Sequence, residues 1–279
     1  MSFNSEMRKI EEIGSKAVKT VGIGRDIISG IIGVAVLAGV VFLQVRFNLI
    51  ESILMSFAES DQFKDPAMWW GYVFPFAFVG VWVFGALYMI FTTIVSIVSI
   101  KSPYGKVTMT LAYIKSVAVA MPFVMVGFLF AFAGVCIGIG CVVNGEYAAI
   151  AGGILVGLMG LAAMSVGVGQ IVANTLAFRD YKATGGIDFT PSRITIFANY
   201  AKERIPLVIG ACVFSCVPIV LVTLALTTPD LDFVAILMMI LMGLVFAGFG
   251  AWLLIYAYKD FKLFKEAAED TDNYTDLKL

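Results

Sequence analysis

The stretches SVAVAMPFVMVGFLFAFAGVCIGIGCVVNG at Ser116–Gly145 and YAAIAGGILVGLMGLAAMSVGVGQIVANTLAF at Tyr147–Phe178 contain no Asp, Glu, Lys or Arg. A helix needs about 20 apolar residues to cross the ~30 Å hydrocarbon core of a bilayer, and both stretches exceed that length. Only Glu146 separates them, and with Asn144 and Gly145 it is suited to a tight turn. We therefore predict a pair of antiparallel transmembrane helices over these residues.

Four further uncharged stretches extend this pattern along the chain. Of the 279 residues, 60% are hydrophobic and only 14% are charged, compared with about a quarter in a soluble domain. Peptide groups in hydrocarbon must find their hydrogen-bond partners within the protein, which favours helices. We predict an all-α membrane helical bundle of about six transmembrane helices in one integral membrane domain, residues 1–265. The predicted spans are 27–47, 68–98, 118–143, 148–177, 206–228 and 233–257.

The basic residues alternate from one side of the predicted spans to the other. All but two of the 19 Lys and Arg residues precede the first span, follow the sixth, or lie between spans two and three or four and five. The exceptions are Arg46 and Lys64. The positive-inside rule therefore predicts a cell (cytoplasmic) membrane protein with both termini in the cytoplasm. The acidic segment 266–279 is predicted to be a disordered cytoplasmic tail.

Two segments that enter spans resemble each other. Lys106–Lys115 and Arg193–Lys202 share a Thr, a Tyr and a Lys at a constant spacing of 87 residues. Both are predicted to be amphipathic helices on the cytoplasmic membrane surface. Thr190 and Pro191 are suited to be the N-cap and the first residue of the second. With the spans that follow, these segments predict hairpin-like repeats, and the N-terminal segment with spans one and two is predicted to be a third, divergent copy.

The ends of spans four and six also match. Ala177–Lys182 and Ala257–Lys262 share the order Ala, aromatic, cation, Asp, aromatic, Lys. One hypothesis is a binding site for lipid headgroups or a partner. The other is an ordinary membrane boundary, where cations extend to phosphates and aromatic rings set the depth. The candidate contacts are Arg179, Asp180, Lys182, Lys259, Asp260 and Lys262.

Small residues recur at helical spacing within the spans. Gly127, Ala131 and Gly134 form such a stripe in span three, and Gly153, Gly157 and others do so in span four. These stripes predict close helix packing, within one chain or between chains. Gln170 and Asn174, one turn apart in span four, are the most polar intramembrane pair. They are suited either to a polar pathway or to hydrogen bonds between helices.

Several kinds of chemistry lack a sequence signature in this chain. Histidine is absent from the sequence, and the motifs of phosphate-binding loops, zinc proteases and serine hydrolases do not occur. Apart from Arg46 near the end of the first, the predicted spans contain no Asp, Glu, Lys or Arg, which argues against ion-coupled carriers and proton relays. We expect no enzymatic activity, no cofactor, no metal site and no nucleic-acid partner. A lipid-modifying enzyme that uses Asp180 or Asp260 is the least favoured alternative.

Two functional hypotheses follow from these observations. The favoured one is a scaffold, assembly or regulatory subunit of a membrane complex, which contacts the lipid bilayer and other membrane proteins or copies of itself. The alternative is an uncoupled channel or permease for a small solute.

Overall fold

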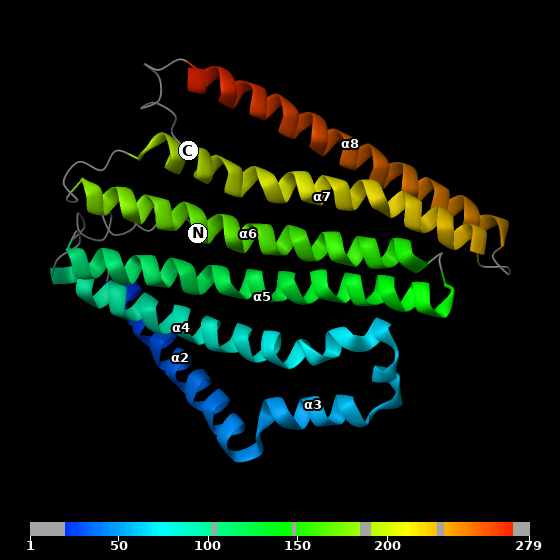
Figure 1. Ribbon diagram of the computed structural model, residues 1–279. Helices are drawn as coiled ribbons and strands as arrows, with labels where there is room; N and C mark the ends of the chain where they lie inside the picture. Colours follow the sequence, from blue (N-terminus) through cyan, green and yellow to red (C-terminus); the bar gives the residue numbers. More distant parts are fainter. Residues whose placement is uncertain (1–19, 102–104, 147–148, 185–190, 228–231, 270–279) are drawn as a thin grey trace. The chain divides into compact units, whose positions relative to one another are not determined.

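The structure is a computed structural model that describes residues 20–101, 105–146, 149–184, 191–227 and 232–269. The described residues form seven α-helices and two 3-10 helices (Figure 1). Six of the α-helices are long and apolar enough to cross a membrane, which makes the chain a multi-pass integral membrane protein. In chain order the elements are α2 (Thr20–Phe47), α3 (Leu49–Glu59), η1 (Asp61–Lys64), η2 (Pro66–Tyr72), α4 (Phe74–Lys101), α5 (Lys106–Asn144), α6 (Ile150–Ala183), α7 (Arg193–Thr227) and α8 (Phe233–Glu269).

The prediction of an all-α protein with six long apolar helices is confirmed, but several of the helices are longer than predicted. Lys106–Lys115 and Arg193–Lys202 are helical, yet each forms the first turns of a long helix, α5 or α7. The prediction of separate surface helices is therefore wrong. Neither segment is divided from its span by a glycine, and Pro122 and Pro206 lie inside the continuous helices. Membrane helices tolerate proline because local adjustments satisfy the freed carbonyl group.

The chain turns between α2 and α3 at a single residue. Asn48 has φ 45° and ψ 51°, in the left-handed region that asparagine enters more readily than most residues. The side-chain oxygen of Gln44 accepts a hydrogen bond from the Ile50 N–H at 3.2 Å, and the Ser52 hydroxyl donates to the Phe47 carbonyl at 2.7 Å. These bonds satisfy backbone groups that the break exposes. Helix α3 was not predicted, because it lies between the predicted spans 27–47 and 68–98.

The described residues form two compact units, and long helices contribute to both. The first unit comprises the described part of Met1–Ser60, Gly71–Val126 and Met164–Lys202. The second comprises Asp61–Trp70, Gly127–Ala163 and the described part of Glu203–Leu279.

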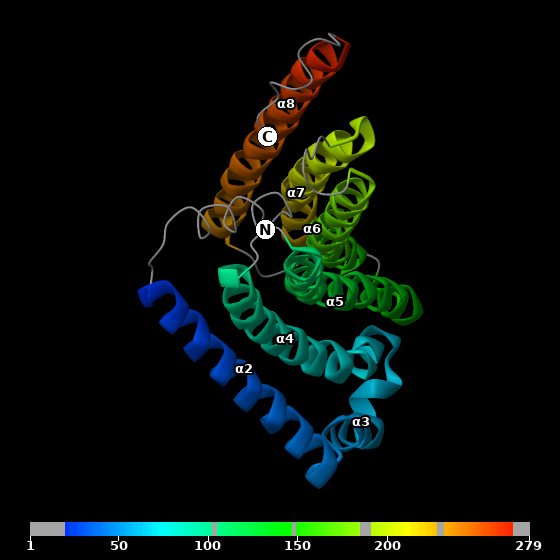
Figure 2. The same ribbon diagram turned by 90° about the vertical axis from the view of Figure 1, so that its left-hand side faces the viewer.

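In the first unit α2 lies alongside α4 (Figure 2). Gly30 permits this approach, because a Cβ atom there would lie 2.4 Å from the Thr93 hydroxyl oxygen. The Thr93 hydroxyl donates to the Asp26 carbonyl, and the Ser96 hydroxyl donates to the Asp26 carboxylate at 2.6 Å. An apolar core joins α4, α5 and α6, and it consists of Val95, Met109, Ala112, Ala177, Phe178 and Tyr181.

In the second unit small residues bring pairs of helices together, as their stripes predicted. A Cβ atom on Gly160 of α6 would lie 2.1 Å from the Ala131 backbone nitrogen of α5. On α8, a Cβ atom on Gly250 would lie 3.0 Å from the Ala211 carbonyl oxygen of α7. The Phe214 ring of α7 fills the adjacent space, with its centroid 5.0 Å from that of Phe249. Close backbone approach replaces the hydrophobic effect as the source of helix association in lipid.

We predict that Gly160→Ala destabilises the protein and that Gly152→Ala does not. The first substitution forces a methyl group against the α5 backbone, whereas a Cβ atom on Gly152 meets nothing within 4 Å. Overpacking of this kind lowers the free energy of unfolding by about 2 kcal/mol. At position 152 the substitution changes only the helix propensity, which favours alanine over glycine by about 1 kcal/mol. Denaturation of both variants in detergent, followed by circular dichroism, tests this, and equal stabilities would contradict the packing argument.

Candidate functional site

Buried polar side chains are concentrated in the first unit. All ten buried polar or charged side chains among the described residues lie there, on α4, α5, α6 and the start of α7. Burial of a polar group in an apolar interior costs free energy unless the group has hydrogen-bond partners. Because these side chains gather in one region, we take that region as the candidate site. We call it the polar cluster, which consists of Ser96, Ser99, Thr108, Lys115, Ser116, Gln170, Asn174, Asp180, Thr195 and Asn199.

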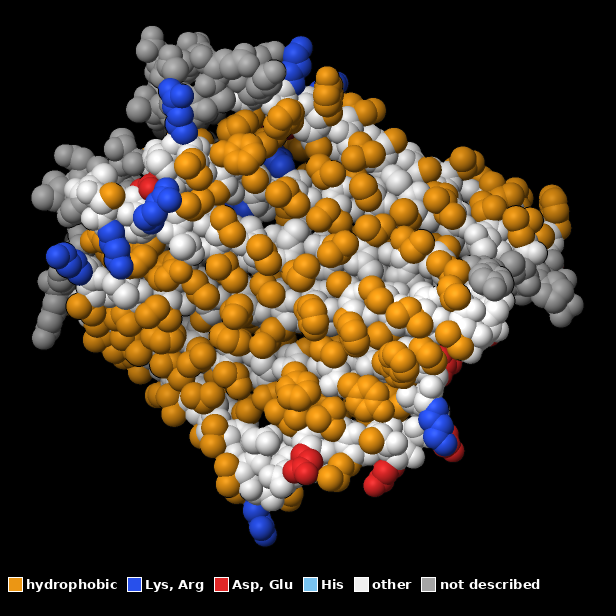
Figure 3. Space-filling model, in the orientation of Figure 1, with side chains coloured by type: hydrophobic (Ala, Val, Ile, Leu, Met, Phe, Trp, Pro, Cys, Tyr) orange, Lys and Arg blue, Asp and Glu red, His pale blue; other side chains and the backbone are white. Residues whose placement is uncertain are grey.

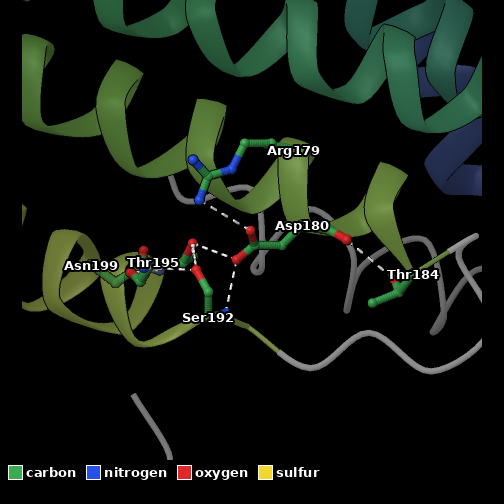
Figure 4. A network of polar contacts seen from close by, with 6 residues as sticks. All are labelled: Arg179, Asp180, Thr184, Ser192, Thr195 and Asn199. Carbon is green, nitrogen blue, oxygen red and sulfur yellow. Dashed lines mark hydrogen bonds and ion pairs between the residues drawn. The ribbon is translucent and has the colours of Figure 1, made fainter.

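Asp180 joins the end of α6 to the beginning of α7. One carboxylate oxygen accepts hydrogen bonds from the Ser192 N–H at 2.8 Å and the Thr195 hydroxyl at 2.6 Å (Figure 4). The other oxygen lies 3.4 Å from a guanidinium nitrogen of Arg179. Hydrogen bonds to an ionised acceptor are stronger than those between neutral groups, and a negative charge is favourable at a helix N-terminus. Asp180 therefore closes the hairpin between these two helices.

Ser192 is the N-cap of α7. Its carbonyl accepts the first helical hydrogen bond, from the Ile196 N–H at 3.0 Å, and its hydroxyl oxygen accepts from the Thr195 N–H at 3.4 Å. The predicted N-cap, Thr190, lies outside the described residues. Pro191 precedes the cap, so its prediction as the first helical residue is wrong.

The hydrogen bonds continue along the first turns of α7. The Asn199 amide donates to the Thr195 carbonyl at 3.0 Å, and the Lys202 ammonium donates to the Asn199 side-chain oxygen at 2.8 Å. Gly169 allows α6 to approach α7 closely near Lys202, because a Cβ atom on Gly169 would lie 3.0 Å from the Lys202 Cα. Asp180 and Thr195 thus join α6 to α7, and Asn199 and Lys202 continue the polar contacts along α7.

The predicted polar pair lies inside the same cluster. Gln170 is 8% exposed and Asn174 is 1% exposed, one turn apart on α6. On the same helix the Thr175 hydroxyl, which points outward, lies 3.0 Å from the Tyr113 hydroxyl of α5. The buried pair therefore faces the interior of the first unit.

Lys115 is a buried cation on α5 that was not among the predicted site residues. It is 6% exposed, and its ammonium nitrogen lies 5.5 Å from the centroid of the Tyr88 ring, a cation–π arrangement. The predicted spans 118–143 and 148–177 lie within uncharged stretches, so Lys115 and Asp180 were placed outside them. The helices α5 and α6 extend beyond these spans and contain Lys115 and Asp180. The signal available in the sequence was that Lys115 recurs as Lys202 in the matching segment, 87 residues later.

The six candidate contacts of the matching span ends lie in two different units. Arg179, Asp180 and Lys182 are on α6 in the first unit. The Arg179 side chain is 59% exposed, and the Lys182 ammonium lies 4.6 Å from the centroid of the Phe178 ring. Lys259, Asp260 and Lys262 are on α8 in the second unit.

Asp260 pairs with an arginine of α7. The Arg204 guanidinium makes two contacts with the Asp260 carboxylate, at 2.8 Å and 3.1 Å, and its central carbon lies 5.7 Å from the Tyr256 ring centroid. About a quarter of each side chain in the ion pair is exposed. The ion contact at 2.8 Å and the hydrogen bond at 3.1 Å together fix both the distance and the orientation of the two groups. Asp180 and Asp260 therefore both link consecutive helices, with different partners.

The groove between α2 and α4 is almost entirely apolar, unlike the polar cluster. It has a volume of about 440 Å³, and the hydroxyl of Thr93, the one polar side chain of its lining, is bonded to the Asp26 carbonyl. Its lining suits a hydrocarbon occupant and not a polar solute. The lining residues are Ile27, Gly30, Ile31, Val34, Ile90, Thr93, Ile94 and Ile97.

Among the described residues, no group of three Asp, Glu or Cys side chains is arranged to hold a metal ion. Comparison of the chain with models of protein families, with curated proteins and with solved structures finds no match in any of the three.

We predict that Asp180→Asn loosens the junction of α6 and α7. The neutral amide keeps the shape but loses the charge that strengthens the bonds to Ser192 and Thr195. Loss of such bonds lowers the free energy of unfolding by about 2 kcal/mol. Hydrogen exchange of the first turn of α7 should be faster in this variant. Asp61→Asn is the control, because that carboxylate is 90% exposed and pairs with an exposed lysine. Similar effects of the two substitutions would contradict the role of Asp180.

We predict strong coupling between Arg204 and Asp260. Arg204→Leu leaves a half-buried carboxylate without its guanidinium, and loss of one partner of a buried pair costs about 3 kcal/mol. The double variant Arg204→Leu, Asp260→Leu should recover most of this loss, because no charge remains to be solvated. Denaturation of the two single variants and the double variant measures the coupling. Additive losses would show that the ion pair does not link α7 to α8.

Proposed function

We propose that the protein is a non-enzymatic subunit of a membrane complex that acts as a scaffold, an assembly factor or a regulator. The observation that carries the proposal is a set of glycines beside which the described part of the chain leaves open space. A Cβ atom on any of them would meet no atom within 4 Å, and every long helix has at least one. They include Gly39, Gly85, Gly138, Gly152, Gly210 and Gly248.

These glycines offer close approach to helices of another protein. Gly30, Gly134 and Gly160 show how the chain uses glycine internally, with backbone against backbone or side chain. In lipid, such sites are the usual basis of helix association. The hydrophobic surface along the helices in Figure 3 is available for these contacts and for lipid.

The polar cluster supports a structural role. Asp180 accepts hydrogen bonds from Ser192 and Thr195 and so holds the end of α6 to the start of α7. A subunit that presents its helices to partners requires such a fixed frame.

The proposal includes an orientation. Arg179 and Arg193, at the junction of α6 and α7, are exposed, as are Lys259 and Lys262 near the end of α8. We place these ends, and both termini, in the cytoplasm by the positive-inside rule.

Affinity purification in a mild detergent, followed by native mass measurement, tests the proposal. We expect a different membrane protein in fixed stoichiometry. The variants Gly39→Val and Gly210→Val should fold normally, because a Cβ atom at either position meets nothing within 4 Å in the described part of the chain, yet reduce the retained partner at least tenfold. Gly160→Ala serves as a control for effects of misfolding on retention. A preparation without any partner, or retention that neither variant changes, would overturn the proposal.

A second candidate function is an uncoupled permease for a small solute. The specific observation in its favour is the buried group of Lys115, Gln170 and Asn174, since polar side chains at membrane depth often mark solute pathways. Solute flux into liposomes distinguishes the two functions. Flux that Asn174→Leu abolishes, together with a partner-free homo-oligomer, would favour the permease.

A further inference from the structure

The walls of the groove between α2 and α4 follow the same residue spacing on both helices. The lining residues lie at intervals of three, one and three residues, within 27–34 on α2 and within 90–97 on α4. These intervals place each set on one face of its helix. Gly30 is buried against Thr93, so the contact of these two residues forms the base of the groove. The groove therefore runs along both helices within the first unit.

The groove begins near the membrane boundary and extends into the hydrocarbon core. Ile27 lies about one turn after Ile23, where the apolar span of α2 begins. Ile97 lies about one turn before Ile100, where the apolar span that contains α4 ends. From Ile27 to Val34 the groove follows about 10 Å of helix. One leaflet supplies half of the ~30 Å core, so the groove matches the depth of an acyl chain from a single leaflet.

The sides of the groove are stiff, and they open away from the protein. Ile31 is 65% exposed, Val34 is 57% exposed and Ile97 is 48% exposed. In a helix, β-branched side chains keep one strongly preferred rotamer, so these walls do not close over the groove. A groove of about 440 Å³ that stayed empty in a bilayer would forfeit the dispersion contacts of its lining. A hydrocarbon group is therefore expected to fill it.

We propose that this groove holds one acyl chain of a phospholipid from the leaflet at the N-terminal end of α2. The one hydroxyl of the lining, on Thr93, donates to the Asp26 carbonyl and so needs no water partner. Lipid tails are as apolar as isoleucine, so the chain is held by contact on two sides and not by the hydrophobic effect. The inference is independent of the proposed function, which rests on other glycines.

Photolabelling from the acyl chain tests the proposal. The protein is reconstituted in phosphatidylcholine vesicles that contain a phosphatidylcholine with a diazirine in one acyl chain, and labelled residues are identified by fragmentation mass spectrometry. Ile31 and Ile97 of the groove are compared with Ile28 and Ile32, which are exposed on α2 outside the groove. We expect at least about fivefold more label in the groove, because a chain between two helices makes more contacts than one on a convex face. Equal labelling of the two pairs would overturn the proposal.

Filling the groove should abolish this preference. In the double variant Ile31→Phe, Ile94→Phe the added rings occupy the space between the helices, so the label on Ile97 should fall to that of Ile28. The control Ile28→Phe, Ile32→Phe adds the same volume outside the groove and should leave the label on Ile97 unchanged. Persistent label on Ile97 in the filled variant, or an equal loss in the control, would contradict an acyl chain in the groove.

The position of the diazirine gives a second measurement on the unaltered chain, which decides the matter if the filled variant fails to fold. A diazirine near the headgroup should label Ile27 and Ile97, whereas one at the end of the acyl chain should label Val34 and Ile90. This order follows from a chain that enters from the leaflet at the N-terminal end of α2. A pattern that does not change with the position of the diazirine would refute the proposal.

Discussion

A peptide group surrounded by hydrocarbon has no water to bond, and most of this structure follows from that constraint. The chain meets it with helices that continue through Pro122, Pro206 and Pro218. Where a helix does break, at Asn48, a side chain of the preceding turn accepts a bond from a backbone group beyond the break. Lipid also removes the hydrophobic drive that joins helices in water, so glycine positions decide which helices meet.

The same constraint shapes the charged groups near the helix ends. Asp180 is bound by a helix N-terminus and hydroxyl groups, and Asp260 is bound by a guanidinium. Two different chemistries thus accommodate a carboxylate at matching sequence positions. In each case the acid joins one helix to a neighbour, and the cation beside it in the sequence is left more exposed than the acid.

The six spans could be predicted because uncharged stretches longer than a bilayer core have few other uses. The ends of the helices could not, because charge was used to delimit them. Lys115 and Asp180 violate that assumption, since tertiary contacts with Tyr88 and with Thr195 accommodate them inside the bundle. Gln170 and Asn174 were recognisable from their polarity alone. The partner of Asp260 was not, because 56 residues separate it from Arg204 and no local pattern connects them.

The two acidic links differ in when they can form during synthesis. Thr195 follows Asp180 by 15 residues, whereas Asp260 follows Arg204 by 56. At about 5–20 residues per second, the ribosome supplies the partners of Asp180 within about three seconds, but leaves Arg204 waiting several times longer. The junction of α6 and α7 can therefore close while the chain is still being made. The attachment of α8 to α7 must wait until α8 has entered the membrane, so it follows the closure of α6 on α7.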